Sequence, residues 1–257
     1  MKTFTYLLHH GKSLKTRKPL KVKSRITKKR KEVTLMNKVP VNIQRFSVVF
    51  TSAKAYRYKE INSNKKTKGS NKKKFQLLED TWGFHGLWPR PKKSMLPLQG
   101  DSIRETDPSI QQFQNSWKPL DSKTNYKFMT YEWSTHGRHQ AKVNYNDYFE
   151  LGHNMATRLK SFKDDIARAY SNIDETLKGT KTIGDVKWRC APAFALSMEL
   201  EKILGYHPEL KASMICGNLH LFEVLVDVDY NTTTKNYEVL KKGAKFTNCA
   251  DNDILYF

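Results

Sequence analysis

The stretch that decides how this sequence is interpreted is Tyr131-Glu132-Trp133-Ser134-Thr135-His136-Gly137. Glu132 and His136 are four residues apart, so in a helix both side chains leave the same face at neighbouring heights. A carboxylate in that position can orient an imidazole and favour its charged form. Because such pairs are also common on protein surfaces, the stretch alone leaves open whether the pair is catalytic or only a surface contact.

A second compact motif lies upstream at Phe84-His85-Gly86-Leu87-Trp88-Pro89. It places another histidine beside a glycine, a tryptophan and a proline. Metal-free cleavage of RNA needs two such groups, since one takes the proton from the ribose 2′-OH and the other protonates the leaving 5′-oxygen. The two motifs together therefore indicate acid–base chemistry on RNA.

In this order the motifs resemble the two active-site segments of the ribonuclease T2 family, whose patterns are roughly FxIHGLWP and HEWxKHGxC. The resemblance spans roughly residues 45–249 and implies a role for each matching residue. His136 would be the general base, His85 the general acid, and Glu132 the group that stabilises charge around the base. Trp88 would offer an aromatic face on which a base can stack.

The second motif departs from the family pattern at three positions. Thr135 stands where the family has a lysine, so the cation that stabilises the phosphorane is missing. Tyr131 replaces a histidine that helps to hold phosphate, and His139 replaces a cysteine. We expect Tyr131 and Thr135, with Trp88, to contact substrate. Glu132, His136 and His139 could also offer metal ligands, but without a cysteine cluster or second carboxylate we expect no metal and no cofactor.

The charge of the chain predicts a polyanionic partner. Its 257 residues include 46 Lys and Arg against 25 Asp and Glu, a net charge of +21. Without a membrane-type amphipathic repeat, RNA is favoured over lipid. Twelve per cent aromatic residues suffice for a packed core. No run of 18 apolar residues occurs, and the apolar patch at residues 4–8 is too short for a secretory signal, so we expect a protein that is not secreted.

Two basic segments are the expected RNA contacts outside the site. Residues 1–40 hold 13 Lys or Arg and one acid, Glu32, which is typical of a mitochondrial targeting segment or of a solvated basic arm. We therefore expect a basic extension at residues 1–43 and a ribonuclease T2-like domain at residues 44–257. A lysine-rich loop at residues 65–74 is either a spacer or a second contact with phosphates. The cations singled out for RNA binding are Lys28, Lys29, Arg30, Lys31, Lys72, Lys73 and Lys74.

Three cysteines are few for a family that is mostly secreted and disulfide-rich. By the resemblance, Cys216 and Cys249 correspond to a late pair and are candidates for a bridge. Cys190 has no clear counterpart and is expected to be a small buried residue. This cysteine usage favours an intracellular compartment, although one that permits a few disulfides remains open.

The resemblance implies an α+β fold, in which an antiparallel sheet carries the active face and helices pack on its other side. The sequence patterns fit this class. They predict strands at residues 46–50, 214–216 and 219–228, with a further strand pair within residues 235–246. Helical spacing predicts helices at residues 110–117, 146–159, 161–173 and 191–204, the last closed by Gly205. His85 is expected at a strand edge, with Gly86 allowing close backbone approach, and residues 182–184 are expected to form a turn.

Two functions fit these features. The first is an RNA-binding protein of the T2 fold with impaired or lost nuclease activity, built into a ribonucleoprotein such as a mitochondrial ribosome. Its partners would be rRNA and neighbouring proteins of the particle, and Thr135 and the basic arm favour it. The alternative is an active, metal-independent endoribonuclease. We expect a mitochondrial location, or else another intracellular ribonucleoprotein compartment, and no membrane partner. A scaffold for other proteins would leave the charge unexplained.

Overall fold

The computed structural model of the chain describes residues 42–63, 81–90, 102–120, 123–139, 143–158 and 161–257. These residues all belong to one compact unit, Val39–Phe257. The basic clusters at residues 28–31 and 72–74 lie outside the described residues, so their role in RNA binding stays a prediction. The domain boundary expected after residue 43 also stays a prediction, because residues 1–41 are not described.

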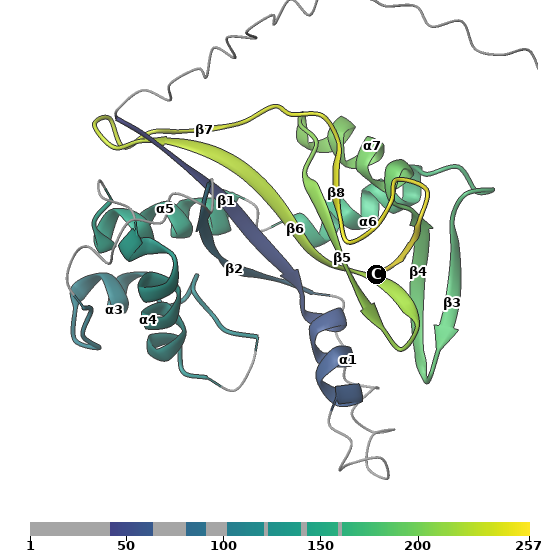
Figure 1. Cartoon of the computed structure of the whole chain (residues 1–257), viewed down its shortest axis with the longest axis horizontal. Coiled ribbons are helices and arrows are strands. Elements are labelled where there is room, and N and C mark those ends of the chain that lie inside the picture. Colours follow the sequence, from purple (N-terminus) through teal and green to yellow (C-terminus); the bar gives the residue numbers. More distant parts are fainter. Residues whose placement is uncertain (1–41, 64–80, 91–101, 121–122, 140–142, 159–160) are drawn as a thin grey trace, which may run out of the picture. The chain divides into compact units, whose positions relative to one another are not determined.

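A nine-stranded sheet organises the described part of the chain (Figure 1). Its main path runs in the order β2-β1-β6-β9-β4-β3, while β5 and β7 pair with β6, and β8 pairs with β5. Most pairs are antiparallel, but β8 runs parallel to β5 and β9 parallel to β6. The strands are β1 (Ile43–Ser52), β2 (Trp82–Pro89), β3 (Gly179–Ile183), β4 (Val186–Pro192), β5 (Glu209–Ile215), β6 (Asn218–Asn231), β7 (Tyr237–Val239), β8 (Lys245–Thr247) and β9 (Ile254–Tyr256).

Six α-helices and a short 3-10 helix accompany the sheet in the described residues. They are α1 (Ala53–Ser63), α3 (Pro108–Phe113), α4 (Asn125–Thr135), η3 (Gly137–His139), α5 (Tyr145–Arg158), α6 (Phe162–Asn172) and α7 (Ala193–Leu204). The longest of these, α5, has 14 residues. Among the described residues, no helix combines the length and the apolar character needed to cross a membrane.

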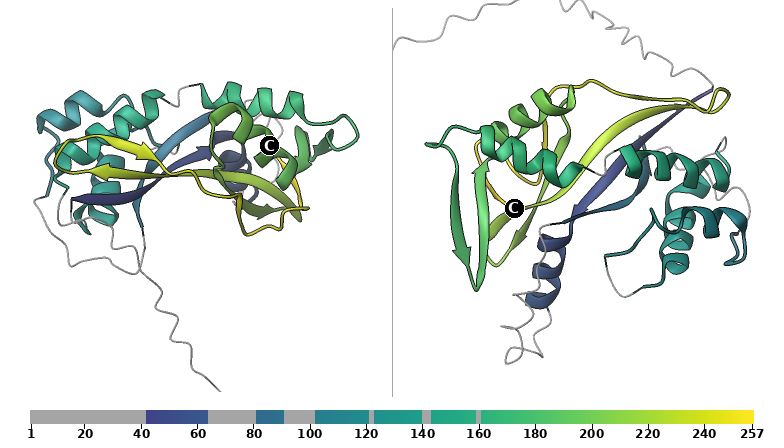
Figure 2. Two further views of the ribbon diagram at one scale, coloured as in Figure 1. Left: turned by 90° about the horizontal axis from the view of Figure 1, so that it is seen from above. Right: turned by 180° about the vertical axis from the view of Figure 1, so that it is seen from behind.

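The two faces of the sheet differ because side chains alternate along each strand. Phe46, Val48 and Phe50 of β1 are buried in the main core, together with the matching alternate residues of β6. Phe50 stacks on Phe162 of α6 with ring centroids 5.3 Å apart. The hydroxyl of Tyr148 on α5 donates to the Leu87 carbonyl at 3.0 Å. Figure 2 shows α5 and α6 along one side of the sheet, so the other face of β1 and β6 is left for polar side chains.

The predicted α+β class is confirmed, as are the core strands β1 and β6 and the helices α5, α6 and α7. The strand predicted at residues 214–216 is the end of a longer strand, β5, which starts at Glu209 and stops before Cys216. Gly205 closes α7 with a φ of 79°, a conformation that glycine adopts without strain. The helix expected at residues 110–117 is shorter and starts earlier, because Pro108 stands in its first turn and suits that position. The turn expected at residues 182–184 lies at residues 184–185 of the β3–β4 hairpin, because Thr182 and Ile183 are still paired in β3.

The strand pair expected within residues 235–246 is wrong in its pairing. β7 joins β6, whereas β8 joins β5 in parallel. Only residues 240–244 separate the two strands, and each of them adds to a strand already in the sheet instead of folding back on the other. The sheet is accordingly mixed and not purely antiparallel.

The bridge expected between Cys216 and Cys249 is also absent, since both are free thiols in the structure. Cys216 lies at the turn between β5 and β6, whereas Asn248, next to Cys249, donates its side-chain amide to the Ala212 carbonyl at 3.3 Å. Cys249 is therefore level with the middle of β5. At a rise of about 3.3 Å per residue, three to four strand residues separate the two thiols by more than the 4.4–6.8 Å that usually separates bridged Cα atoms.

Candidate active site

Helix α4 positions Glu132 and His136. The helix begins after Thr124, whose hydroxyl accepts a hydrogen bond from the Lys127 amide, as an N-cap residue does. It ends at Thr135, so His136 is not within the helix but caps it, with its amide donating to the Glu132 carbonyl at 2.9 Å. The imidazole Nε2 of His136 lies 3.9 Å from Glu132 Oε2. The expected proximity is confirmed, although the helix stops one residue before the histidine.

A β-bulge positions His85. Along the β1–β2 pair, Val49 faces Gly86 and Phe50 faces Phe84, which leaves His85 as the extra residue of β2. Bulges re-aim a side chain in this way, often beside active sites. The His85 Nε2 lies 3.9 Å from Glu132 Oε1, and its Nδ1 lies 3.1 Å from the Thr51 hydroxyl. Both imidazoles therefore flank one carboxylate, each near a different oxygen.

Glu132 is fully buried beneath these two rings. Burial raises its pKa to about 7, against the lowering effects of His85, Trp88 and Lys123. Gly86 makes this placement possible, because a Cβ there would lie 2.2 Å from Glu132 Oε2. The expected close approach at Gly86 is thus confirmed, and the partner that approaches is the carboxylate of the other motif.

Aromatic side chains surround the two imidazoles. The Trp88 ring centroid lies 5.4 Å from that of His85 and 5.4 Å from that of His136. Phe128 of α4 stacks on His85 with centroids 6.3 Å apart and an interplanar angle of 26°. The Trp88 ring from β2 and the Phe128 ring from α4 thus limit the orientations open to His85.

A second buried carboxylate, Glu223 of β6, contacts His85 from the sheet side, with 3.3 Å between Oε1 and Nδ1. In the strand register, Glu223 faces Thr51 of β1 on one side and Lys211 of β5 on the other. Its other oxygen pairs with Lys211. Burial alone would raise the pKa of Glu223, but the hydrogen bonds with His85 and Lys211 lower it below its usual range. Glu223 is therefore ionised in the folded protein at neutral pH.

A small pocket of about 90 Å³ opens beside His85 and Glu132. Phe128, Tyr131, Lys118 and Lys123 are among the residues that line it. Tyr131 is 53% exposed, and the Lys123 ammonium lies 5.6 Å from its ring centroid. The pocket thus combines an aromatic wall with two cations, which suits a nucleotide.

The structure brings His85, Trp88, Glu132 and His136 together and places Tyr131 at the pocket. Thr135 instead ends α4, half-buried and not among the pocket's lining residues. Thr51, Lys211 and Glu223 also belong to the site, although sequence reasoning did not select them. For Glu223 a signal existed, because it is a charged residue inside the apolar run of the predicted strand 219–228.

Comparisons with known proteins identify the family and the fold. The sequence model of the Ribonuclease T2 family matches residues 48–183, which is more than half of the chain. No match was found among curated proteins. Ribonuclease MC1 from bitter gourd seeds superposes with a TM-score of 0.57 at 19% identity, covering 83% of this chain and 100% of its own.

A mutant of ribonuclease MC1 in complex with 5′-UMP gives a TM-score of 0.58 at 19% identity, over 84% of this chain and 100% of that one. Ribonuclease NT in complex with 5′-AMP gives 0.51 at 16% identity, over 83% and 98% respectively. These structural likenesses concern the fold. Together with the family match over both histidine motifs, they show that the chain belongs to the ribonuclease T2 family.

Proposed function

We propose that the chain is an endoribonuclease that cleaves single-stranded RNA without a metal, through a 2′,3′-cyclic phosphate. The observation that supports this most is the placement of two imidazoles, each 3.9 Å from one fully buried carboxylate. A surface pair would not need a glycine to make room for the carboxylate, nor a bulge to aim the second ring. The arrangement is instead that of an acid and a base held for one reaction.

The two imidazoles divide the proton transfers of the first step. His136 removes the proton from the ribose 2′-OH, and the 2′-oxygen forms a bond to the phosphorus. The bond from phosphorus to the 5′-oxygen breaks as His85 donates a proton to that oxygen. The products are a 2′,3′-cyclic phosphate and a 5′-hydroxyl, and the protein is left with His136 protonated and His85 neutral.

The surroundings of the imidazoles suit this division. Glu223 accepts a hydrogen bond from the Nδ1 side of His85, so Nε2 is the nitrogen that carries the proton given to the leaving oxygen. Glu132, between the rings, stabilises the positive charge that moves from His85 to His136. Phe128 and Trp88 offer faces on which bases can stack, and Lys118 and Lys123 offer cations for phosphates.

The expected activity is slow, because Thr135 leaves the second motif without its cation. Removing one preorganised charge-stabilising group costs about 10²- to 10³-fold in rate. The test is incubation of the purified protein with single-stranded RNA in EDTA, followed by detection of cyclic-phosphate ends. His85→Ala and His136→Ala should each abolish the ends. His207→Ala serves as the matched control, because His207 pairs with Glu201 near the end of α7. Absence of cyclic phosphate from the unaltered protein would refute the proposal.

A second function is favoured by the charge of the N-terminal segment. We propose as this alternative that the chain is a structural component of a large ribonucleoprotein, for instance a mitochondrial ribosome, with impaired or lost cleavage. Thirteen cations against one acid in residues 1–40 would bind rRNA phosphates irrespective of sequence. Thr135 supports the same hypothesis, because the loss of the motif's cation weakens cleavage, and a particle built of RNA tolerates an inefficient nuclease better than an efficient one.

Deletion of residues 1–40 separates the two functions. The ribonucleoprotein role predicts that the deletion strongly weakens binding to RNA and makes it less dependent on salt, since fewer counterions are released. The nuclease role predicts that the deletion leaves cleavage of short RNA largely intact, because the described site lies entirely in residues 42–257. Equal binding by the full and shortened chains would rule out the role given to the segment.

A further inference from the structure

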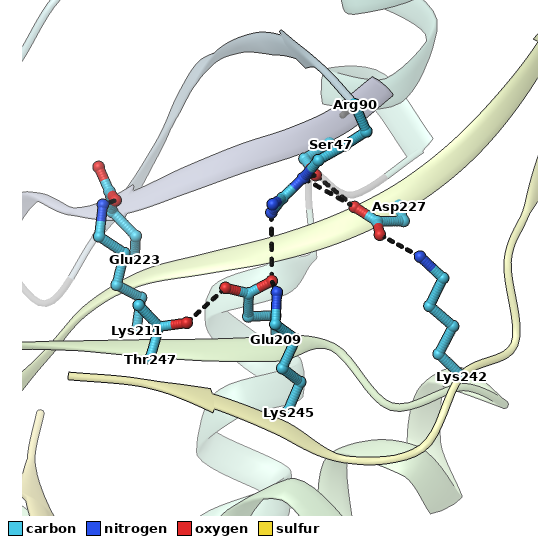
Figure 3. A network of polar contacts seen from close by, with 9 residues as sticks. All are labelled: Ser47, Arg90, Glu209, Lys211, Glu223, Asp227, Lys242, Lys245 and Thr247. Atoms are coloured by element: carbon cyan, nitrogen blue, oxygen red, sulfur yellow. Dashed lines mark hydrogen bonds and ion pairs between the residues drawn. The ribbon is translucent and has the colours of Figure 1, made fainter. Parts of the chain in front are cut away.

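The polar face of the sheet carries a set of ion pairs that the proposed mechanism does not use. Arg90 reaches Ser47 Oγ at 2.6 Å and Glu209 Oε2 at 3.2 Å, and Lys245 pairs with the same Glu209 oxygen at 2.6 Å (Figure 3). The Lys211–Glu223 pair lies on the neighbouring part of β5 and β6. It differs from the other pairs because Glu223 also touches an imidazole of the site.

Three contacts connect this pair with His85 and its surroundings. Lys211 pairs with one oxygen of Glu223, and the other oxygen lies 3.3 Å from His85 Nδ1. The Lys211 ammonium also lies 5.3 Å from the Trp88 ring centroid, on the indole that stands between the two imidazoles. Glu223 is buried, with a side-chain exposure of 4%, whereas Lys211 is 29% exposed. A buried carboxylate keeps its charge only when a cation or strong donors compensate for its lost hydration.

We propose that Lys211 and Glu223 form a positioning pair for His85, in which Lys211 keeps Glu223 ionised and Glu223 holds the proton on His85 Nδ1. The Nε2 atom is thereby directed toward the site as the proton donor. This inference rests on the proposed RNA cleavage, in which His85 is the general acid. Neither residue of the pair touches the reacting atoms, so both act through the imidazole.

The charges around His85 determine what the pair does. Glu132 of α4 faces Nε2 at 3.9 Å, and Glu223 of β6 faces Nδ1. Lys211 of β5 faces Glu223, and Lys123 lines the same pocket as His85. Thr51 of β1 and the rings of Trp88 and Phe128 complete the surroundings without adding charge. Glu223 is thus the charged group in contact with Nδ1, and its removal should change the imidazole most directly.

The activity test compares Glu223→Gln and Lys211→Met with Glu209→Gln and Lys245→Met. The second two variants remove the same charges from a pair on the same face that does not touch His85. We expect Glu223→Gln to lower kcat by about 10- to 100-fold, a part of what general acid catalysis contributes, with KM changed less than about twofold. The control variants should change neither constant by more than about twofold. Equal losses in the control and test variants would overturn the inference.

The pH dependence gives a readout that a merely structural role would not move. The alkaline limb of the rate profile reports the loss of the acid's proton. Without the negative charge of Glu223, the protonated ring is less stable, so this limb should move to lower pH by about one unit. Without Lys211, Glu223 loses the cation that keeps it ionised, so the limb should move in the same direction but by less. Shifts of opposite sign in the two variants would overturn the inference.

A measurement that needs no turnover separates this inference from the proposed function. In full-length protein with ¹⁵N-labelled histidine, the two ring nitrogens of His85 can be assigned by comparison with His85→Ala. The neutral ring should carry its proton on Nδ1, and in Glu223→Gln the proton should redistribute toward Nε2. If the neutral ring of the unaltered protein already carried its proton on Nε2, the positioning role of Lys211 and Glu223 would be refuted. Absence of cleavage with the expected tautomer would instead refute only the nuclease function.

The double variant Lys211→Met with Thr135→Lys tests whether Lys211 acts through Glu223 or only as a nearby positive charge. If the pair positions His85, a lysine at position 135 leaves the Lys211→Met shift of the alkaline limb in place. Full restoration of both the rate and the limb by the new lysine would overturn the positioning role, because charge alone would then suffice.

Discussion

Two carboxylates face the same imidazole from opposite sides, and their surroundings give them different charges. Glu132, at the end of α4, is fully buried between His85 and His136, and burial raises its pKa to about 7. Glu223, in the middle of β6, is almost as deeply buried, yet its pKa is lowered by the hydrogen bonds with His85 and Lys211. Burial is common to both, so the hydrogen bonds that Glu223 accepts from His85 and Lys211 make the difference.

The two carboxylates therefore have opposite effects on the stability of the protein when they ionise: Glu132 belongs to the α4 half of the site and Glu223 to the β5–β6 half. A carboxylate with a raised pKa costs stability when it ionises, whereas one with a lowered pKa contributes stability when it ionises. The ionised form of Glu132 is therefore held in place at a cost in stability, as is common for groups with perturbed pKa values at functional sites. In the β5–β6 half, the ionised Glu223 stabilises the fold through its contacts with His85 and Lys211.

The largest effect is expected from Gly86→Ala, which removes the space that Glu132 occupies. The new Cβ would lie 2.2 Å from Oε2 and 3.1 Å from the carboxylate carbon, so the fully buried carboxylate would have to leave its place between the two imidazoles. We expect a loss of about 3 kcal/mol in the free energy of unfolding, measured by urea denaturation.

Gly179→Ala is the matched control for that variant. A Cβ at Gly179, in the edge strand β3, would meet only Cys190 Sγ at 3.6 Å, an ordinary contact. This substitution should leave stability unchanged or raise it by up to about 1 kcal/mol. A similar loss of stability in both variants would mean that the effect of Gly86→Ala does not come from the contact with the Glu132 carboxylate.

Glu132→Gln should stabilise the protein above neutral pH while weakening catalysis. The folded state holds the proton of Glu132 more tightly than the unfolded chain, with a pKa of about 7 against 4.5. The stability that this proton contributes is complete below about pH 4.5 and is lost as the pH rises to about 7. At pH 8 the variant should therefore be more stable by about 1 to 3 kcal/mol, measured by thermal or urea denaturation at several pH values. A gain that does not depend on pH would contradict the account.

Glu223→Gln should have the opposite sign, because its carboxylate contributes stability in the ionised form. That contribution is present above the unfolded-state pKa of about 4.5 and is lost as the pH falls through the lowered folded-state pKa. At pH 7 we expect a loss of about 1 to 2 kcal/mol, since Lys211 is partly exposed and water can solvate it. The loss should shrink toward pH 3 in the same denaturation series. A cost that is the same at pH 3 and pH 7 would disprove the role of the charge.

The sequence predicted the α4 half of this comparison and missed the β5–β6 half, for a physical reason. Glu132 and His136 are local, so the helical spacing already brings them together, although it did not show that the helix ends at Thr135. His85 needed a bulge whose extra residue is decided by the register with β1. Lys211 and Glu223 meet it only because β5 and β6 pair in one register, which no local pattern contains. The prediction of a Cys216–Cys249 bridge was wrong because the positions of the two cysteines in the sequence do not determine the register in which β8 pairs with β5.

The smallest effect is expected from Thr135→Lys. This variant places a lysine near Glu132, as Lys211 is placed near Glu223. Position 135 is the last residue of α4, whose last turn has no basic residue, and it lies three residues from Glu132. A cation there interacts favourably with the helix terminus and with a carboxylate at that spacing, each worth about 0.3 to 0.5 kcal/mol. It should also lower the pKa of Glu132, so the loss of stability between about pH 4.5 and 7 should become shallower. Thr124→Lys, at the other end of the helix, is the control: it removes the N-cap and so lowers stability at every pH, but it should not change that slope. An unchanged slope in Thr135→Lys as well would mean that a cation at position 135 does not offset the effect of burial on the pKa of Glu132.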